Sequence, residues 1–182
     1  MTTTYIALLR GINVGGKKKM PMADLRQLLE KSGYVNIRTY IQSGNILFEI
    51  AEQAYISQLE SHLAKIIEDH FGFAVPVMVK SFTHWQEVVF RNPFLQKEDT
   101  MDHLYLTWLK AAPSSDVLQA ADPDKYLPDR FYIQGDAVYV YCAGKYHESK
   151  LSNAFFEKQL DVTATTRNWK TVVKLQDMAL GN

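Results

Sequence analysis

The sequence contains one cysteine and no long apolar run. Because Cys142 has no second cysteine to pair with among the 182 residues, an internal disulfide is excluded. No stretch approaches the roughly 18 consecutive apolar residues that a membrane-spanning helix needs. The start of the chain, Met1-Thr2-Thr3-Thr4, also lacks the basic and then apolar pattern of a secretory signal. These absences argue against disulfide scaffolds and helical membrane proteins, and they predict a cytoplasmic protein.

The chain also has no excess of charge of either sign, because 20 Lys and Arg balance 20 Asp and Glu. The balance is uneven along the chain. Residues 1–50 carry seven basic and three acidic side chains, a surplus of 4, and residues 141–182 carry six and four, a surplus of 2. General nucleic-acid binding through bulk charge is therefore not favoured. Ordinary scatter of surface charge and a local basic site both remain compatible with this pattern.

Apolar residues make up 47% of the sequence, which is enough for a well-filled core. In the first half, the spacing of apolar residues and turn signals predicts strands and helices in alternation. We expect strands at 4–9, 36–41, 45–50 and 75–80, and helices at about 21–32, 53–70 and 83–90. The segment Gln42-Ser43-Gly44-Asn45 is a hairpin signal between two of these strands.

The second half repeats this order of elements without a convincing residue-level repeat. We expect strands at 104–109, 131–133, 138–142 and 162–165, and helices at 114–121, 152–160 and 169–180. The order in each half is that of the split β-α-β, or ferredoxin-like, unit. The predicted fold class is therefore α+β, with two ferredoxin-like subdomains at 1–92 and 103–182. Each would have an antiparallel sheet, and a helix would end the chain.

A glycine-rich basic loop follows the first predicted strand. It carries Arg10-Gly11, then Asn13, then Gly15-Gly16, then three lysines that begin at Lys17. Glycines allow close backbone approach, and the cations favour an anionic ligand. The loop is not a Walker A sequence, because no Ser or Thr follows the lysine, and its glycines do not have the G-x-G-x-x-G spacing. A tight turn explains the glycines but not the guanidinium group, so a structural and a functional interpretation both stay open.

Topology predicts which side chains accompany this loop. In an antiparallel split β-α-β sheet, the loop after the first strand lies at the same edge as the hairpin between the second and third strands. Residues 10–20 should therefore lie beside Gln42, Ser43 and Asn45. The helix that begins at Pro21 would bring its amide groups and positive dipole end to the same place.

Two polar segments of the second half should share one end of their sheet by the same argument. One contains Ser149-Lys150 before helix 152–160, and the other contains Thr166-Arg167-Asn168 in a turn after strand 162–165. Helix capping is the alternative explanation for both: Thr166 or Asn168 would cap the terminal helix, and Ser149-Lys150 would cap helix 152–160.

Four long motifs resemble a bacterial family known only as domain of unknown function 1697. They read A-L-L-R-G-I-N-V-G-G-K from Ala7, T-Y-I-Q-S-G-N from Thr39, S-K-L-S-N-A-F-F-E-K-Q-L from Ser149, and A-T-T-R-N-W-K-T-V from Ala164. The resemblance covers almost the whole chain. One departure is Asp161, where the family often carries glycine. The resemblance implies an α+β fold with two subdomains, and it implies no activity.

No established catalytic or metal-binding pattern is present. The five histidines are scattered, and no histidine or carboxylate spacing resembles a zinc or calcium site. We therefore predict no metal and no cofactor. Cys142 lies in a strand pattern and is expected to be a packed core thiol. Adjacent residues rarely have the geometry of a serine–lysine catalytic pair, so Ser149-Lys150 gives little support for an enzyme, and an enzyme of unrecognised type is left open.

Tyrosines suggest a different function. Tyr139 and Tyr141 alternate along a strand and should face one side of the second sheet, where Tyr105 is expected to join them. Ferredoxin-like sheets that bind RNA stack bases on such rings. An RNA- or protein-binding module that uses this aromatic face is therefore an alternative, and internal packing of the same face is another.

The preferred hypothesis is a protein that binds a small anionic ligand, phosphorylated or nucleotide-like. The main contacts would come from Arg10, Asn13, Lys17, Gln42 and Arg167, because arginines pair bidentately with phosphate or carboxylate oxygens. Amide groups of the glycine-rich loop would complete the binding site. The full set of candidate ligand-binding residues is Arg10, Gly11, Asn13, Gly15, Gly16, Lys17, Gln42, Ser43, Asn45, Ser149, Lys150, Thr166, Arg167 and Asn168.

Overall fold

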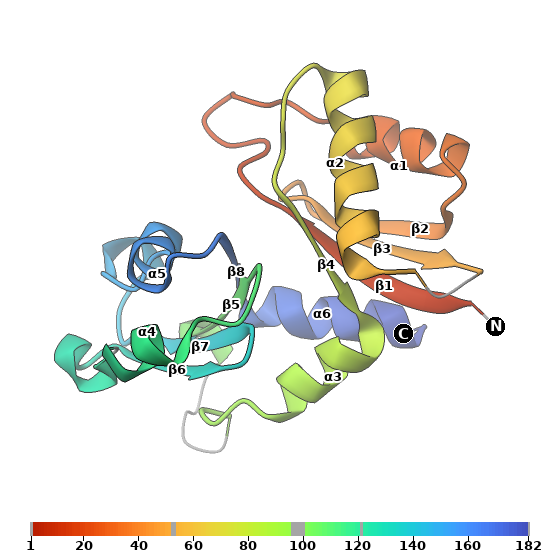
Figure 1. Cartoon of the computed structure of the whole chain (residues 1–182). Helices are drawn as coiled ribbons and strands as arrows, with labels where there is room; N and C mark the ends of the chain where they lie inside the picture. The colour runs from red at the N-terminus through yellow and green to blue at the C-terminus, as the bar shows by residue number, and fades with distance from the viewer. Residues whose placement is uncertain (1, 52–53, 96–100, 121, 182) are drawn as a thin grey trace. The chain divides into compact units, whose positions relative to one another are not determined.

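The computed structural model of the chain describes residues 2–51, 54–95, 101–120 and 122–181 (Figure 1). The chain divides into two compact units. The first comprises Met1–Glu87 with Leu175–Asn182, and the second comprises Val88–Lys174. The subdomain boundaries at 92 and 103 stay a prediction, and residues 96–100 of the predicted connection lie outside the described residues.

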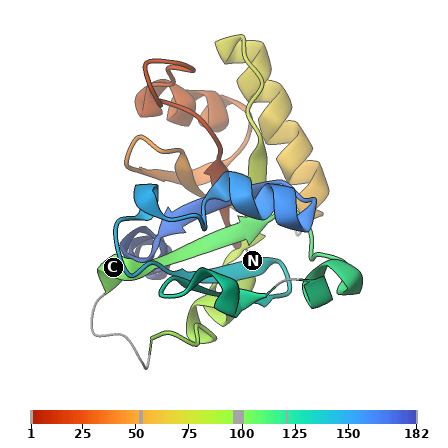
Figure 2. The same ribbon diagram turned by 90° about the vertical axis from the view of Figure 1, so that its left-hand side faces the viewer.

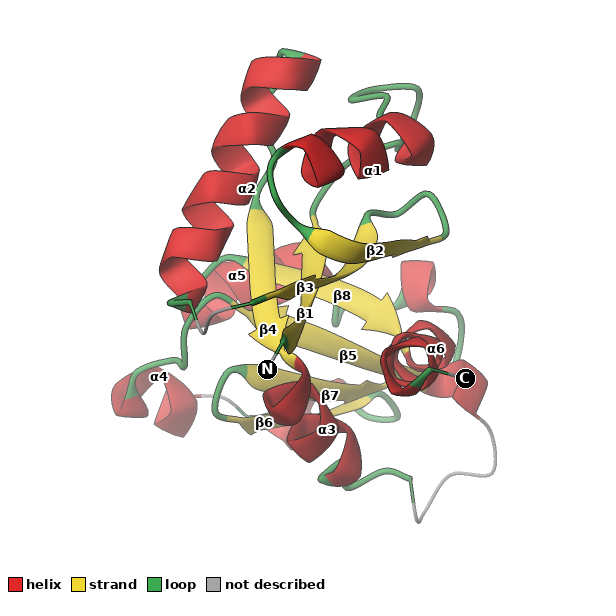
Figure 3. Cartoon of the chain, turned by 90° about the vertical axis from the view of Figure 1, so that its right-hand side faces the viewer, coloured by secondary structure: helices red, strands yellow, loops and turns green. Residues whose placement is uncertain are grey.

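The first unit contains a four-stranded antiparallel sheet. Its elements in chain order are β1 (Thr3–Leu9), α1 (Met22–Lys31), β2 (Val35–Tyr40), β3 (Asn45–Ile50), α2 (Ile56–Phe71) and β4 (Val77–Ser81). The strand order is β2-β3-β1-β4 (Figure 3). Leu8 of β1 pairs with Asn45 of β3, and Leu9 pairs with Val77 of β4. The C-terminal end of β1 therefore lies at the same edge of the sheet as the turn between β2 and β3.

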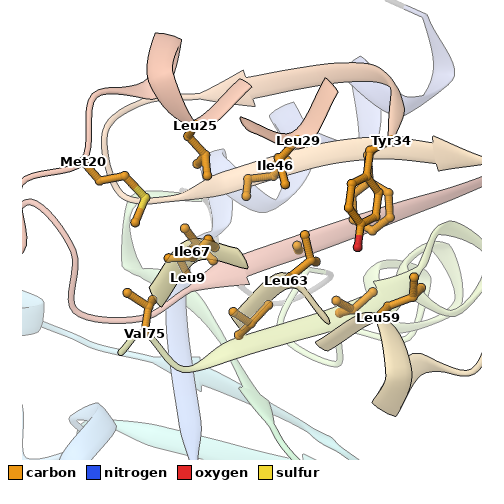
Figure 4. Close-up of a cluster of buried hydrophobic side chains, with 14 of the residues drawn as sticks. Leu9, Met20, Leu25, Leu29, Tyr34, Ile46, Leu59, Leu63, Ile67 and Val75 are labelled. Atoms are coloured by element: carbon orange, nitrogen blue, oxygen red, sulfur yellow. The ribbon is translucent and has the colours of Figure 1, made fainter. Parts of the chain in front are cut away.

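The core of the first unit fills the space between the sheet and the two helices (Figure 4). Leu25 and Leu29 lie one turn apart on α1, and Leu63 and Ile67 lie one turn apart on α2, so each pair presents one apolar stripe. Leu9 contributes from β1, and all five side chains are almost completely buried. Burial of such a side chain stabilises the fold by about 1.5–3 kcal/mol.

The second unit contains a four-stranded antiparallel sheet of the same order. Its elements are β5 (Leu104–Leu109), α4 (Ser115–Ala120), β6 (Arg130–Gln134), β7 (Ala137–Tyr141), α5 (Asn153–Leu160) and β8 (Ala164–Asn168). The strand order is β6-β7-β5-β8, and α5 packs on β8 (Figure 2). Short 3-10 helices occupy Met101–His103, Pro123–Tyr126 and Tyr146–Glu148.

Two helices contain the boundaries between the units. These are α3 (Phe82–Phe90), in which the first unit ends at Glu87, and α6 (Trp169–Leu180), in which the second unit ends at Lys174. None of the helices in the described part of the chain has the length and apolarity to cross a bilayer.

The two sheets share a backbone pattern that the sequence does not reveal. The N–H groups of Leu9 and Leu109 each donate to the residue just before the third strand of their sheet, both at 2.8 Å. The N–H groups of Arg10 and Lys110 each donate to the residue just before the fourth strand, at 3.1 and 2.9 Å. The mixed α+β class and the doubled order of elements are confirmed. The ferredoxin-like assignment of each unit stays a prediction.

Candidate functional site

The glycine-rich loop between β1 and α1 folds into a miniature hairpin. The Lys17 N–H donates to the Val14 carbonyl at 3.0 Å, with Gly15 and Gly16 between them at φ of 57° and 73°. Positive φ at both central residues defines a type I′ turn, which glycine adopts without strain. The Asn13 N–H donates to the Lys18 carbonyl at 3.2 Å and extends the hairpin by one pair. The loop is therefore an ordered hairpin with two glycines in its turn.

The side chain of Asn13 fixes this hairpin in place. Its Oδ1 accepts from the Met20 N–H at 2.8 Å, and its Nδ2 donates to the carbonyl groups of Met20 at 3.0 Å and Gln42 at 2.8 Å. Asn13 has φ 55°, a left-handed conformation that asparagine tolerates better than most residues. The predicted proximity of residues 10–20 to the turn at Gln42 is thus confirmed. The amide of Asn13 makes three backbone hydrogen bonds, so its geometry favours a role in loop order.

The neighbouring turn between β2 and β3 is equally constrained. Asn45 is buried, and its Nδ2 donates to the Tyr40 carbonyl at 3.0 Å and to the Ser43 hydroxyl at 2.9 Å. Gly44 lies against the end of β1, where a Cβ atom would come within 2.6 Å of the Leu9 Cβ. Ile41 has φ 49° and is 49% exposed, which is a strained conformation for a β-branched residue.

Cationic side chains surround this ordered backbone. Lys17, Lys18 and Lys19 are exposed, and the Lys18 Nζ donates to the Ala74 carbonyl at 2.7 Å. Over the residues that the structure describes, none of the three lysines forms an ion pair with an acidic side chain. Arg10 is half-buried at the base of the loop. The next helix, α1, begins directly after this loop and its N-cap residue Pro21, whose side chain does not cap the first-turn amide groups.

In the second unit, Ser149 organises a turn. Its hydroxyl donates to the Asp129 carboxylate at 2.5 Å and accepts from the Leu151 N–H at 3.1 Å. The proposed cap of helix 152–160 at Ser149-Lys150 is wrong, because the hydroxyl of Ser152 accepts from the Phe155 N–H and caps α5. The sequence offers two serines three residues apart, and only the local backbone decides which of them reaches the helix.

The segment around Arg167 is part of a strand, so the predicted turn after residue 165 is wrong. Arg167 pairs with Leu106 of β5. Its Nη1 donates to the Thr165 hydroxyl at 3.0 Å and to the Thr166 carbonyl at 2.9 Å. Burial lowers the pKa of the Arg167 guanidinium to about 10 because the charged form loses hydration.

The residues on either side of Arg167 are engaged in the fold. The Thr166 hydroxyl donates to Asn153 Oδ1 at 3.1 Å and also contacts the Thr107 hydroxyl at 2.8 Å. Asn168 Oδ1 accepts from the Thr171 N–H at 2.8 Å, which confirms the predicted cap of the terminal helix at Asn168. Asn153 was not among the predicted site residues, although its side chain brings α5 and β8 together. No sequence signal separates it from other polar residues in a first helical turn.

On the predicted tyrosine face, the ring of Tyr139 is buried and engaged within the fold. Tyr139 is 1% exposed, and its hydroxyl donates to the Val88 carbonyl at 2.8 Å. Burial raises the pKa of Tyr139 to about 12. Tyr105 pairs with Val140, whereas Tyr139 pairs with Leu106, so the expectation that Tyr105 shares the face of Tyr139 is wrong.

Among the described residues, no group of three or more His, Cys, Asp and Glu side chains could hold a metal ion. Cys142 is fully buried, and burial raises the pKa of its thiol, so the prediction of a packed core thiol is confirmed.

The chain belongs to the family described as Protein of unknown function (DUF1697), whose model matches residues 1–139. It is similar to a solved structure, that of the conserved bacterial protein SP0830 from Streptococcus pneumoniae. The two chains are 25% identical, the match covers 98% of this chain and 99% of that chain, and the TM-score is 0.75. No curated protein matches the chain. These comparisons establish the family and the α+β fold.

Proposed function

We propose that this member of the DUF1697 family binds a small anionic molecule, phosphorylated or nucleotide-like, at the basic loop of residues 10–20. The main support for the proposal is that this loop is both basic and held in one conformation by hydrogen bonds. Lys17, Lys18 and Lys19 have no acidic partner among the described residues, and the backbone between them and β1 is held by the three hydrogen bonds of Asn13.

Electrostatics supports this use of the loop. Four cations fall between residues 10 and 19 with no acidic residue among them, and like charges held in one short loop repel one another. A flexible loop would relieve this repulsion by spreading out, but the hairpin and the Asn13 contacts prevent it. A bound anion would remove the repulsion, and an already ordered site loses little conformational entropy on binding.

The residues take different roles in this proposal. Arg10 at the base of the loop would pair bidentately with phosphate oxygens, and Lys17 beside the two-glycine turn would add a point charge. The exposed side chain of Gln42 would donate from the neighbouring turn. Asn13 would act as a positioning residue rather than a contact, because its amide already makes three hydrogen bonds.

Thermal unfolding of the full chain with and without pyrophosphate and nucleotides tests the proposal. A ligand at about 100 times its Kd should stabilise the protein by about 2.7 kcal/mol, or roughly 5–10 °C in Tm. Arg10→Ala and Lys17→Ala should each lose most of this shift. Lys31→Ala, at the opposite end of α1, removes the same charge and should keep it.

Two results would count against the proposal. An equal loss of the shift in Lys31→Ala would reduce it to a general effect of net charge or of excluded salt. A large fall of the ligand-free Tm in Arg10→Ala would make Arg10 a structural residue and remove it from the site.

A further inference from the structure

Two adjoining pockets in the second unit differ in chemistry. The first has a volume of about 140 Å³ and has the rings of Tyr126, Phe131, Phe155 and Phe156 in its lining, together with Leu160 and the polar side chains of Asp122, Lys125 and Gln159. The ring centroids of Tyr126 and Phe155 are 5.0 Å apart, and those of Phe155 and Phe156 are 5.1 Å apart, both in edge-to-face geometry. An apolar cavity of about 150 Å³ accommodates a benzene molecule. The first pocket therefore has the size for a single six-membered ring, and its four aromatic side chains can pack against one.

The second pocket has a volume of about 260 Å³ and a charged lining that includes Lys125, Asp129, Glu148 and Lys150. Its acidic groups are already engaged. Asp129 accepts from the Ala143 N–H at 2.9 Å and from the Ser149 hydroxyl at 2.5 Å.

The other three charged side chains of this pocket differ in whether they have an ion-pair partner. Glu148 lies 3.9 Å from the Lys145 Nζ and 3.6 Å from the His147 Nε2. Within the residues that the structure describes, neither Lys125 nor Lys150 forms an ion pair. Lys125 and Lys150 are therefore the charged side chains of this pocket with which a carboxylate could pair.

Lys125 and Tyr126 line both pockets, so the two spaces share one wall. We propose that together they form a binding site for a small aromatic carboxylate, with the ring among Phe131, Phe155 and Phe156 and the carboxylate near Lys125 and Lys150. This site is separate from the basic loop of the first unit and does not depend on that proposal. It gives Lys150 a role that helix capping does not explain.

Calorimetric titration of the full chain with three compounds of one shape tests this site. They are 3-phenylpropionate, the neutral 3-phenylpropanol and the cationic 3-phenylpropylamine. We expect the carboxylate to bind with a Kd of about 0.1–1 mM, which is ordinary for a ligand of this size. Tighter binding of the alcohol or the amine than of the carboxylate, or no saturation with the carboxylate at about 10 mM, would overturn the proposal.

Three variants locate the binding. Lys150→Ala should weaken carboxylate binding about fivefold to tenfold through loss of a charge-assisted contact. Lys158→Ala, an exposed lysine of α5 that lines neither pocket, is the matched control and should leave the Kd unchanged. Gln159→Trp, at an exposed rim position of the aromatic pocket, should fill it and abolish binding. Undiminished binding in both Lys150→Ala and Gln159→Trp would show that the pockets are not the site.

Discussion

The side-chain amide of Asn13 and the backbone of Met20 form a reciprocal pair of hydrogen bonds. The Met20 N–H donates to Asn13 Oδ1 at 2.8 Å, and Asn13 Nδ2 donates back to the Met20 carbonyl at 3.0 Å. The side-chain amide thus bonds to both the N–H and the carbonyl of Met20, as a neighbouring strand would, and it closes the loop just before α1. Because Nδ2 also reaches the Gln42 carbonyl, one side chain ties three segments of the first unit together.

Replacement of Asn13 should therefore destabilise the loop and weaken anion binding together. Asn13→Gly removes the three hydrogen bonds but accepts φ 55°, and we expect it to lower the free energy of unfolding by about 1–3 kcal/mol. Asn13→Ala adds backbone strain and should cost about 1 kcal/mol more. Urea denaturation measures both. If Asn13→Gly unfolds at the wild-type urea concentration, the loop does not depend on this side chain.

Gly44 should be far less tolerant of a methyl group than Gly72, although both have nearly the same φ. At Gly44 (φ 77°) a Cβ atom would lie 2.6 Å from the Leu9 Cβ and 2.8 Å from the Ile12 Cδ1, whereas nothing lies within 4 Å at Gly72 (φ 78°). Gly72→Ala should cost about 1 kcal/mol through strain. Gly44→Ala should cost about 2–4 kcal/mol, because overpacking adds to the strain.

Chemical denaturation of the two glycine variants gives both values under the same conditions. Equal costs would mean that the end of β1 moves away from the turn without penalty.

Asp161 ends α5 in a left-handed conformation, with φ 51° and ψ 42°. Glycine adopts this conformation without a Cβ penalty, so Asp161→Gly should stabilise the protein by about 0.5–1 kcal/mol. Asp161→Ala should destabilise it, because alanine lacks the local hydrogen bonding that helps aspartate in this region. Calorimetric melting should rank the three proteins Gly, Asp, Ala from highest to lowest Tm. Any other order would show that the side chain of Asp161 has a role beyond the cap.

The sequence predicted most elements of the fold because their signals are local. The strands at 45–50 and 104–109 have the predicted bounds, since apolar side chains and turn residues mark their ends. The strand β8 was placed too early, because Thr166, Arg167 and Asn168 look like a turn. In the structure these three residues pair with β5. The hydroxyl of Thr166 forms a hydrogen bond with that of Thr107, so this polar group has a partner inside the sheet. That contact spans 59 residues and has no local signal.

The place of the loop beside the turn was predictable from the sequence, but the role of Asn13 was not. Strand topology placed the loop of residues 10–20 beside the turn at Gln42, and the hydrogen bond from Asn13 confirms it. Whether Asn13 contacts a ligand or the backbone depends on how the loop folds back to Met20, and spacing alone does not encode this. The ligand-binding roles of Arg10 and Lys17 stay predictions.

Alkaline pH should destabilise the first unit through Tyr34. Burial raises the pKa of Tyr34 to about 12 from 10.0, and its hydroxyl lies 2.7 Å from the His62 Nδ1. Both the folded and the unfolded chain keep the phenol proton below pH 10, so the stability from the protonated phenol is fully present there. Between pH 10 and about 12 only the unfolded chain releases it, and up to about 2–3 kcal/mol is lost.

Urea unfolding at pH 9 and pH 11 should show about half of this loss, roughly 1.4 kcal/mol, for the wild type, because pH 11 lies midway between the two pKa values. The loss should be smaller for Tyr34→Phe. A loss of the same size in the variant would assign the alkaline sensitivity to other groups. Burial also raises the pKa of Tyr139 to about 12. Tyr139→Phe is therefore the next variant to measure in that case.

Amide NMR titration of the full chain with pyrophosphate, with chloride at equal ionic strength as reference, shows whether the loop of residues 10–20 binds an anion. We predict saturable shifts of the amide signals of Gly11, Gly15, Gly16 and Lys17 that are lost in Lys17→Ala and kept in Lys31→Ala. Shifts that do not saturate, or that are largest outside residues 10–20 and the turn at 41–45, would contradict the account.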